Sequence, residues 1–131
     1  MYKILLFSFC SLFAFSTIAC HHNHEDEDDS TIPVITIEEP VDGESIAGEV
    51  HFHGTVTDNS LHEMTIKVTR DSDGAEQFSA APTVHDLTAY DFDEHWTPSG
   101  LTEETAVTVT ITAEDHGSNK ATKVVKFKVK P

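Results

Sequence analysis

Apolar and polar side chains alternate along most of the chain after residue 30, and turn-forming residues separate the alternating segments. A period of two residues is typical of strands with one buried face, because successive side chains of a strand point to opposite sides. No stretch of this region keeps the 3.6-residue period of an amphipathic helix. The pattern predicts seven strands, at residues 33–38, 48–58, 61–70, 76–80, 87–98, 105–115 and 122–130.

The same alternation assigns side chains to a buried or an exposed face. The predicted buried positions are Val50, Phe52 and Val56; Met64, Ile66 and Val68; Tyr90, Phe92 and Trp96; Val107, Val109, Ile111 and Ala113; and Val125, Phe127 and Val129. Short antiparallel strands separated by turns, over a length of about 100 residues, predict an immunoglobulin-like β-sandwich of about seven strands. We expect this single domain at residues 32–131.

The N-terminal segment has a different pattern. Lys3 precedes an apolar run from residue 4 to about residue 15, which is shorter than the roughly 20 apolar residues that a membrane span needs. A basic residue, a short apolar run and small residues before Cys20 are typical of a cleaved signal peptide, which we expect at residues 1–19. Residues 21–30 have no apolar side chain, so residues 20–31 are predicted to be a disordered, acidic tether.

Residues 17–20, "TIAC", resemble the lipobox of bacterial lipoproteins, although an aliphatic residue is usual where this chain has Thr17. The resemblance implies that Cys20 is lipidated and becomes the N-terminus of the mature protein. The acidic residues 25–29 resemble the surface-export signal of lipoproteins from Bacteroidetes-type bacteria. This second resemblance implies an outer-membrane anchor at the cell surface, with the periplasmic face as the alternative. Ordinary secretion, with Cys20 as an incidental thiol, is the other interpretation.

Three stretches, "PVITIEEPVDGE", "VHFHGTVTDNS" and "VTITAEDHGSNKATKVVKFKV", resemble bacterial immunoglobulin-like domains. The last hairpin of those domains carries A-x-D-x-x-G-N between two hydrophobic strands. Ala113, Asp115, Gly117 and Asn119 match this motif, with Ser118 inserted before the asparagine. With the lipobox and the length, the chain as a whole resembles small Bacteroidetes-type lipoproteins of unknown function. The resemblance implies a fold and leaves the chemistry open.

Charge and cysteine content narrow the function classes. The formal net charge is −15, from 23 acidic and 8 basic residues, which excludes nucleic acid as a partner because phosphate binding needs a basic face. Signal-peptide cleavage would remove Cys10 and leave Cys20 as the one cysteine, without a disulfide. No nucleophile motif or phosphate-binding loop is present. We therefore expect a binding module of the cell envelope with a protein or glycan partner, and no enzyme.

Nine histidines raise divalent-metal binding as the alternative function. His51 and His53 share the exposed face of one predicted strand, about 6.5 to 7 Å apart. The exposed face of the strand at 87–98 carries Asp91, Asp93 and His95. These two strands are neighbours in an immunoglobulin-like sandwich, so the five side chains form one candidate site for zinc or copper(II). The alternative is an ordinary solvated face.

A second candidate site lies at one end of the predicted sandwich, where three loops and the tether meet. The loops contribute Asp58, Asn59 and His62; His85 and Asp86; and Asp115, His116 and Asn119. Of these, Asp58, His62, Asp115 and His116 form the alternative metal set, and its oxygen donors suit calcium. The tether histidines His21, His22 and His24 are a further, weak transition-metal candidate. Loop acids also serve simply as turn formers.

Overall fold

The computed structural model describes residues 30–131. The predictions for residues 1–29, namely the signal peptide, lipidation at Cys20 and most of the tether, lie outside the described residues. In the described part, the strands are β1 (Val34–Glu39), β2 (Ser45–Ala47), β3 (Val50–Thr57), β4 (Leu61–Arg70), β5 (Glu76–Ala80), β6 (Ala89–Trp96), β7 (Thr105–Asp115) and β8 (Lys120–Lys130). Residues 30–131 contain no helix long and apolar enough to cross a membrane.

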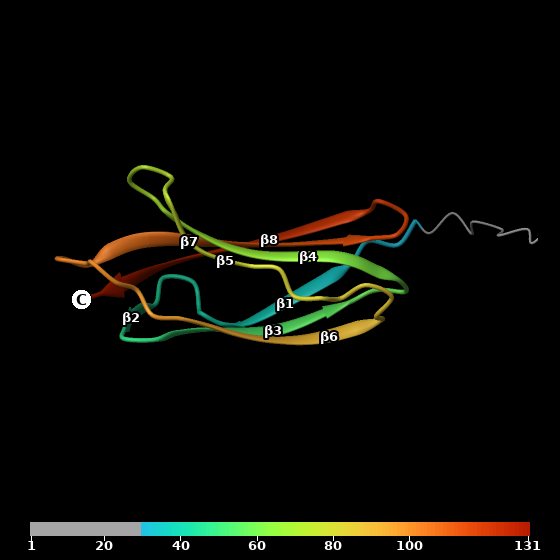
Figure 1. Ribbon diagram of the computed structural model, residues 1–131, viewed down its shortest axis with the longest axis horizontal. Coiled ribbons are helices and arrows are strands. Elements are labelled where there is room, and N and C mark those ends of the chain that lie inside the picture. The colour runs from blue at the N-terminus through green and yellow to red at the C-terminus, as the bar shows by residue number, and fades with distance from the viewer. Residues whose placement is uncertain (1–29) are drawn as a thin grey trace, which may run out of the picture.

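The strands form two sheets that face each other across an apolar core. One sheet has the order β1-β3-β6, and the other has the order β2-β8-β7-β4-β5. Figure 1 shows them as two layers, with β3 and β6 in the lower layer and β4, β7 and β8 in the upper layer. The all-β, two-layer architecture predicted from the alternation is confirmed, and each of the seven predicted strands has a counterpart.

The described part also holds an eighth strand, β2, which the sequence did not predict and which pairs in parallel with β8. The prediction of antiparallel strands alone was wrong in this respect. The backbone docks on β8 through Gly43 N to Lys126 O at 2.7 Å and Lys128 N to Glu44 O at 2.8 Å. A strand of three residues is too short to show a period, so only its pairing with β8 defines it.

The core collects the inward side chains of both sheets. Its fully buried members are Ile35, Val50, Phe52, Val56, Leu61, Met64, Ile66, Val68, Val84, Phe92, Val107, Val109, Ile111, Ala113, Phe127 and Val129. All of them lie between residues 35 and 129, so residues 30–131 contain a complete core and are expected to fold as a unit. Tyr90, Trp96 and Val125 were predicted to be buried but are only half-buried against this core. Tyr90 and Trp96 lie on β6, which ends its sheet and therefore has a neighbour on one side only. Val125 lies on β8 before the stretch that pairs with β2.

Gly54 in β3 lies where three elements approach closely. A Cβ atom at this position would lie 2.1 Å from the carbonyl oxygen of Thr36 in β1 and 2.6 Å from Cζ of Phe92 in β6. Both separations are shorter than real carbon contacts, so any side chain would push β1 or the Phe92 ring away. A glycine is therefore required for β3 to pack this closely between β1 and β6, three residues after His51 and next to His53.

Candidate metal centre

The structure pairs β3 with β6 and brings the five residues of the first candidate site onto one exposed face. In the antiparallel register, His51 lies opposite His95, His53 opposite Asp93, and Asp91 opposite Thr55. The side chains nevertheless do not converge on one point. His53 Nδ1 lies 3.0 Å from Glu38 Oε2 in β1, whereas His95 Nε2 lies 3.4 Å from Asp93 Oδ1.

A different set of ligands gathers at the start of this strand pair. Glu49, which immediately precedes β3, has a carboxylate oxygen close to both His51 and His95. We call Glu49, His51 and His95 the sheet cluster. Their donor atoms lie within 4.8 Å of one another. The sequence analysis did not select Glu49, although the strand predicted at residues 48–58 contains it and the alternation places it on the same face as His51.

The end of the sandwich predicted as the second candidate site holds three histidines from three separate segments. His62 lies in β4, His85 in the connection between β5 and β6, and His116 in the turn between β7 and β8. We call these three residues the pole trio. The ring centroids lie 5.1 Å apart for His62 and His85, 4.8 Å for His62 and His116, and 4.7 Å for His85 and His116.

Backbone hydrogen bonds fix the connection that carries His85. Leu61 N donates to Leu87 O at 2.9 Å, and Asp86 N donates to Leu61 O at 2.9 Å, so the connection is held against the start of β4. Val84, fully buried, anchors it in the core. Asp86 adopts a positive φ of 64°, a conformation that aspartate tolerates better than most residues. The position of His85 beside His62 therefore follows from the packing of this connection.

The turn that carries His116 is closed by a buried carboxylate. Asp115, only 1% exposed, accepts hydrogen bonds from Asn119 N and Asn119 Nδ2, both at 2.8 Å. Lys120 Nζ pairs with Glu114 Oε2 at 2.8 Å across the same hairpin, and this hydrogen bond raises the pKa of Lys120. His116 N donates to Ser60 O at 3.1 Å, which joins the turn to the β3–β4 connection.

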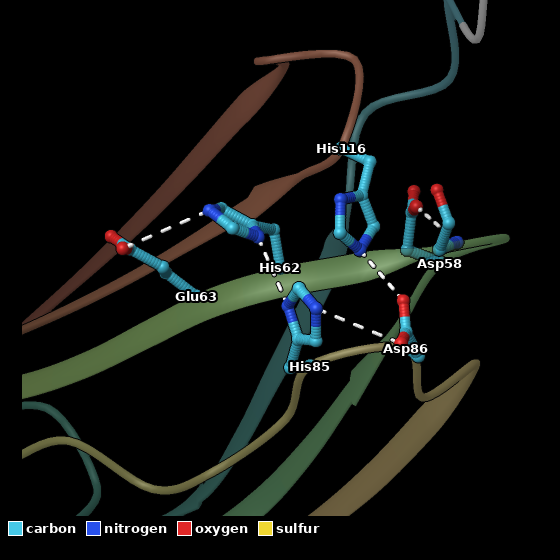
Figure 2. Close-up of polar contacts among 7 residues, drawn as sticks. Asp58, His62, Glu63, His85, Asp86 and His116 are labelled. Atoms are coloured by element: carbon cyan, nitrogen blue, oxygen red, sulfur yellow. Dashed lines mark hydrogen bonds and ion pairs between the residues drawn. The ribbon is translucent and has the colours of Figure 1, made fainter. Parts of the chain in front are cut away.

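The ring nitrogens of the pole trio have two kinds of neighbour, another ring nitrogen or a carboxylate. His62 Nδ1 and His85 Nδ1 lie 3.1 Å apart. On the outer side, each Nε2 atom has a carboxylate as its neighbour. His116 Nε2 lies 2.9 Å from Asp86 Oδ1, and His85 Nε2 lies 3.6 Å from Asp86 Oδ2. His62 Nε2 lies 3.8 Å from Glu63 Oε1. Figure 2 shows Asp86 below His116 and to the right of His85, with Glu63 on the far side of His62.

This arrangement determines which nitrogens are available as ligands. An ionised carboxylate only accepts hydrogen bonds, so His116 Nε2 must donate to Asp86 and a neutral His116 keeps its lone pair on Nδ1. In Figure 2 this second nitrogen lies on the side of the ring that faces His62. Metal-bound histidines commonly donate their other N–H to a carboxylate in this way. One nitrogen from each member of the trio lies within 4.8 Å of the other two.

The donor set suits a transition metal better than calcium. Zinc binds imidazole nitrogen at 2.0–2.1 Å, which places tetrahedral ligand atoms roughly 3.3 Å apart, close to the 3.1 Å between the Nδ1 atoms of His62 and His85. Calcium prefers six to eight oxygen ligands. The two predicted oxygen donors are committed elsewhere, since Asp115 is buried against Asn119 and Asp58 Oδ1 accepts a hydrogen bond from Ser60 N at 2.9 Å.

A cavity of about 310 Å³ borders the pole trio. His62 and His85 form part of its wall, and the rest comes from β4 and the β5–β6 connection, including Met64, Pro82 and Val84. Glu63 lines the same cavity, and the side chains of His62 and His85 remain 39% and 52% exposed, so both imidazoles are accessible from solvent.

The sequence analysis placed all three histidines of the pole trio at one end of the sandwich, but it did not predict a centre made of nitrogens. His85 and Asp86 were left out of the preferred metal set, which contained Asp58, His62, Asp115 and His116. Separations of 23 and 31 residues match no metal-binding motif. One feature of the sequence could have indicated these positions: His62 and His85 are each followed directly by an acidic residue, Glu63 and Asp86.

The chain matches no model of a known protein family and no curated protein. Among solved structures, it is similar to an engineered protein whose crystal structure was determined at 1.98 Å, with a TM-score of 0.55 and 19% sequence identity. The match covers 76% of this chain and 20% of the other, so this chain spans about one fifth of that protein. At this level of identity the similarity concerns the fold alone.

Proposed function

We propose that this chain is a lipid-anchored protein of the bacterial cell envelope whose immunoglobulin-like domain binds a divalent transition-metal ion, zinc or copper. The ligands are His62, His85 and His116, and the role is binding without catalysis. One observation carries the proposal. The three imidazoles have their Nε2 atoms beside carboxylates, while Nδ1 atoms of different segments approach to 3.1 Å.

The alternative to metal binding is a solvated histidine cluster, and its energetics are less favourable. Without an ion, one of the Nδ1 atoms of His62 and His85 has to donate to the other, so the contact uses one lone pair only. Protonation of all three rings would place like charges within 5.1 Å of one another. A divalent ion accepts lone pairs from all three rings at once, and the carboxylates of Glu63 and Asp86 offset its charge.

The strand order supports the immunoglobulin-like assignment. If β1, β3, β4, β5, β6, β7 and β8 are lettered A, B, C, C′, E, F and G, the sheets become A-B-E and G-F-C-C′. Immunoglobulin-like sandwiches divide strands A, B and E from strands C, F and G in the same way. The short β2 then adds to strand G at the edge of the second sheet.

Envelope anchoring rests on the sequence at residues 17–20. Replacing Cys20 by Ser should remove the lipidated residue and move the protein from the membrane fraction to the soluble fraction. Mass spectrometry of the mature N-terminal peptide should find a lipid on Cys20 in the parent protein. An unmodified mature N-terminus at another residue would contradict the anchor and leave ordinary secretion as the better interpretation.

Metal binding is tested with a tether-neutral protein, which starts at residue 20 and carries Cys20→Ser and Asn in place of His21, His22 and His24. Its affinity for zinc and copper(II) is measured by competition with a chromogenic indicator. His85→Ala should weaken one equivalent by more than about 100-fold, since even changes in the outer carboxylates of metal sites cost roughly 10- to 100-fold.

His53→Ala is the matched control, because His53 is similarly exposed but is paired with Glu38 and lies outside the pole trio. It should bind metal as the parent does. Unchanged affinity in His85→Ala would contradict the proposed function, and the domain would then be interpreted as an interaction module for a protein or glycan.

A further inference from the structure

The sheet cluster lies at the other end of β3 from the pole trio. His51 and His95 are Cα partners across β3 and β6, and their ring centroids lie 4.4 Å apart. Directly opposed residues of an antiparallel pair have their Cβ atoms about 4.5–5.5 Å apart. Two imidazoles at this position are therefore held side by side by the backbone pairing itself.

Glu49 adds a carboxylate oxygen at equal distances from the two rings. Glu49 Oε1 lies 3.4 Å from His51 Nε2 and 3.4 Å from His95 Nδ1. These separations exceed the 2.7–3.2 Å of ordinary N–H···O hydrogen bonds. They are close to the roughly 3.3 Å that separates neighbouring ligand atoms of a tetrahedral zinc ion with bonds of 2.0–2.2 Å. The oxygen is thus spaced as a ligand beside two nitrogen ligands.

Asp93 provides the outer neighbour of this cluster. Its Oδ1 atom lies 3.4 Å from His95 Nε2, on the nitrogen opposite to the one that faces Glu49. A carboxylate on the second nitrogen orients a ligating imidazole and makes it more basic. His53 is not part of the arrangement, since its Nδ1 atom is 3.0 Å from Glu38. The five-residue site expected from the sequence is thereby reduced to two imidazoles, a new carboxylate and one outer aspartate.

The geometry points to a second site for a divalent transition-metal ion, zinc or copper(II), bound by Glu49, His51 and His95. The side chains remain 52%, 47% and 43% exposed, so solvent fills the remaining coordination positions. About six residues of β3, roughly 20 Å of strand, separate His51 from the end of the domain that carries the pole trio. Sites this far apart are expected to bind independently.

Zinc stoichiometry tests this inference, with isothermal titration of the tether-neutral protein. The parent should bind two equivalents. The double variant His51→Ala/His95→Ala should bind one, His62→Ala/His116→Ala should bind one, and the combination of all four substitutions should bind none. His53→Ala is again the control and should bind two. The replaced side chains are exposed or half-buried, so circular dichroism should show each variant folded.

The outcomes separate this inference from the proposed function. One equivalent in both the parent and the His51→Ala/His95→Ala variant would overturn the second site and leave the pole site standing. Two equivalents in the His62→Ala/His116→Ala variant would overturn the pole site instead. Glu49→Gln should retain the fold and weaken the second equivalent by at least about 10-fold, because an amide oxygen is a poorer ligand than a carboxylate.

Discussion

The pole trio and the sheet cluster are both groups of three potential ligands, but they are built in different ways. The sheet cluster comes from two paired strands and the residue just before one of them, so one register determines it. The pole trio takes one histidine from β4 and two from connections that meet only in the folded domain. The first is a consequence of strand periodicity, and the second is a consequence of how loops pack at the end of a sandwich.

The two groups also differ in their donors and in their support. The pole trio has three nitrogens, and Asp86 contacts two of its rings, at 2.9 and 3.6 Å. The sheet cluster has two nitrogens and one oxygen, and Asp93 contacts one ring at 3.4 Å. Because preorganised ligands pay less entropy on binding, we expect the pole trio to bind zinc more tightly than the sheet cluster.

The largest effect is expected from Gly54→Ala, which acts on the sheet cluster through the backbone. The added Cβ would overlap Thr36 O and Phe92 Cζ, so the free energy of unfolding should fall by about 2–3 kcal/mol. Movement of β6 away from β3 should also weaken the second zinc equivalent more than the first. Urea unfolding and zinc titration of the same variant measure the two quantities.

Ser79→Ala, on the exposed side of β5, is the control for this prediction and should change stability by less than about 0.5 kcal/mol. If Gly54→Ala proves as stable as the parent, the close packing of β1, β3 and β6 is wrong. An equal loss of both equivalents would show that the two sites are coupled.

A smaller and more specific effect is expected from the two outer aspartates. Asp86→Asn should weaken zinc binding at the pole trio by roughly 10- to 100-fold, since the neutral amide has only one acceptor oxygen where the carboxylate offers one to each of two rings. Asparagine tolerates the positive φ of this position, so the fold should be unchanged. Asp93→Asn should weaken the sheet cluster by only a few-fold, because Asp93 contacts one ring, at 3.4 Å, whereas Asp86 contacts two.

Titration of both variants with the indicator used for His85→Ala measures this difference, and Asp91→Asn serves as the matched control. Asp91 lies opposite Thr55, away from the sheet cluster. A larger loss in Asp93→Asn than in Asp86→Asn would reverse the expected order of the two sites. If neither variant loses affinity for zinc, Asp86 and Asp93 do not support metal binding at either site.

Much of the scaffold was predictable because burial imposes a period of two on each long strand. Phe52, Ile66 and Ile111 were assigned inward from alternation alone, and all are fully buried. The neighbouring positions of β3 and β6 followed from the expected fold, whereas the register that sets His51 opposite His95 came only from the structure. The half-burial of Trp96 did not follow, because alternation gives the face of a strand and not the presence of a neighbour at its edge.

The sequence by itself determined that this protein is an all-β, acidic chain with histidines on its surface, because local alternation and charge are properties of residues close together in the chain. Only the tertiary structure decided which histidines meet. Residues 62, 85 and 116 belong to segments whose mutual positions depend on loop hydrogen bonds and on the buried Val84 and Asp115. The ligands of a metal ion need positions accurate to fractions of an ångström. Packing of distant segments provides that accuracy, whereas alternation along a strand determines only the face on which a side chain lies.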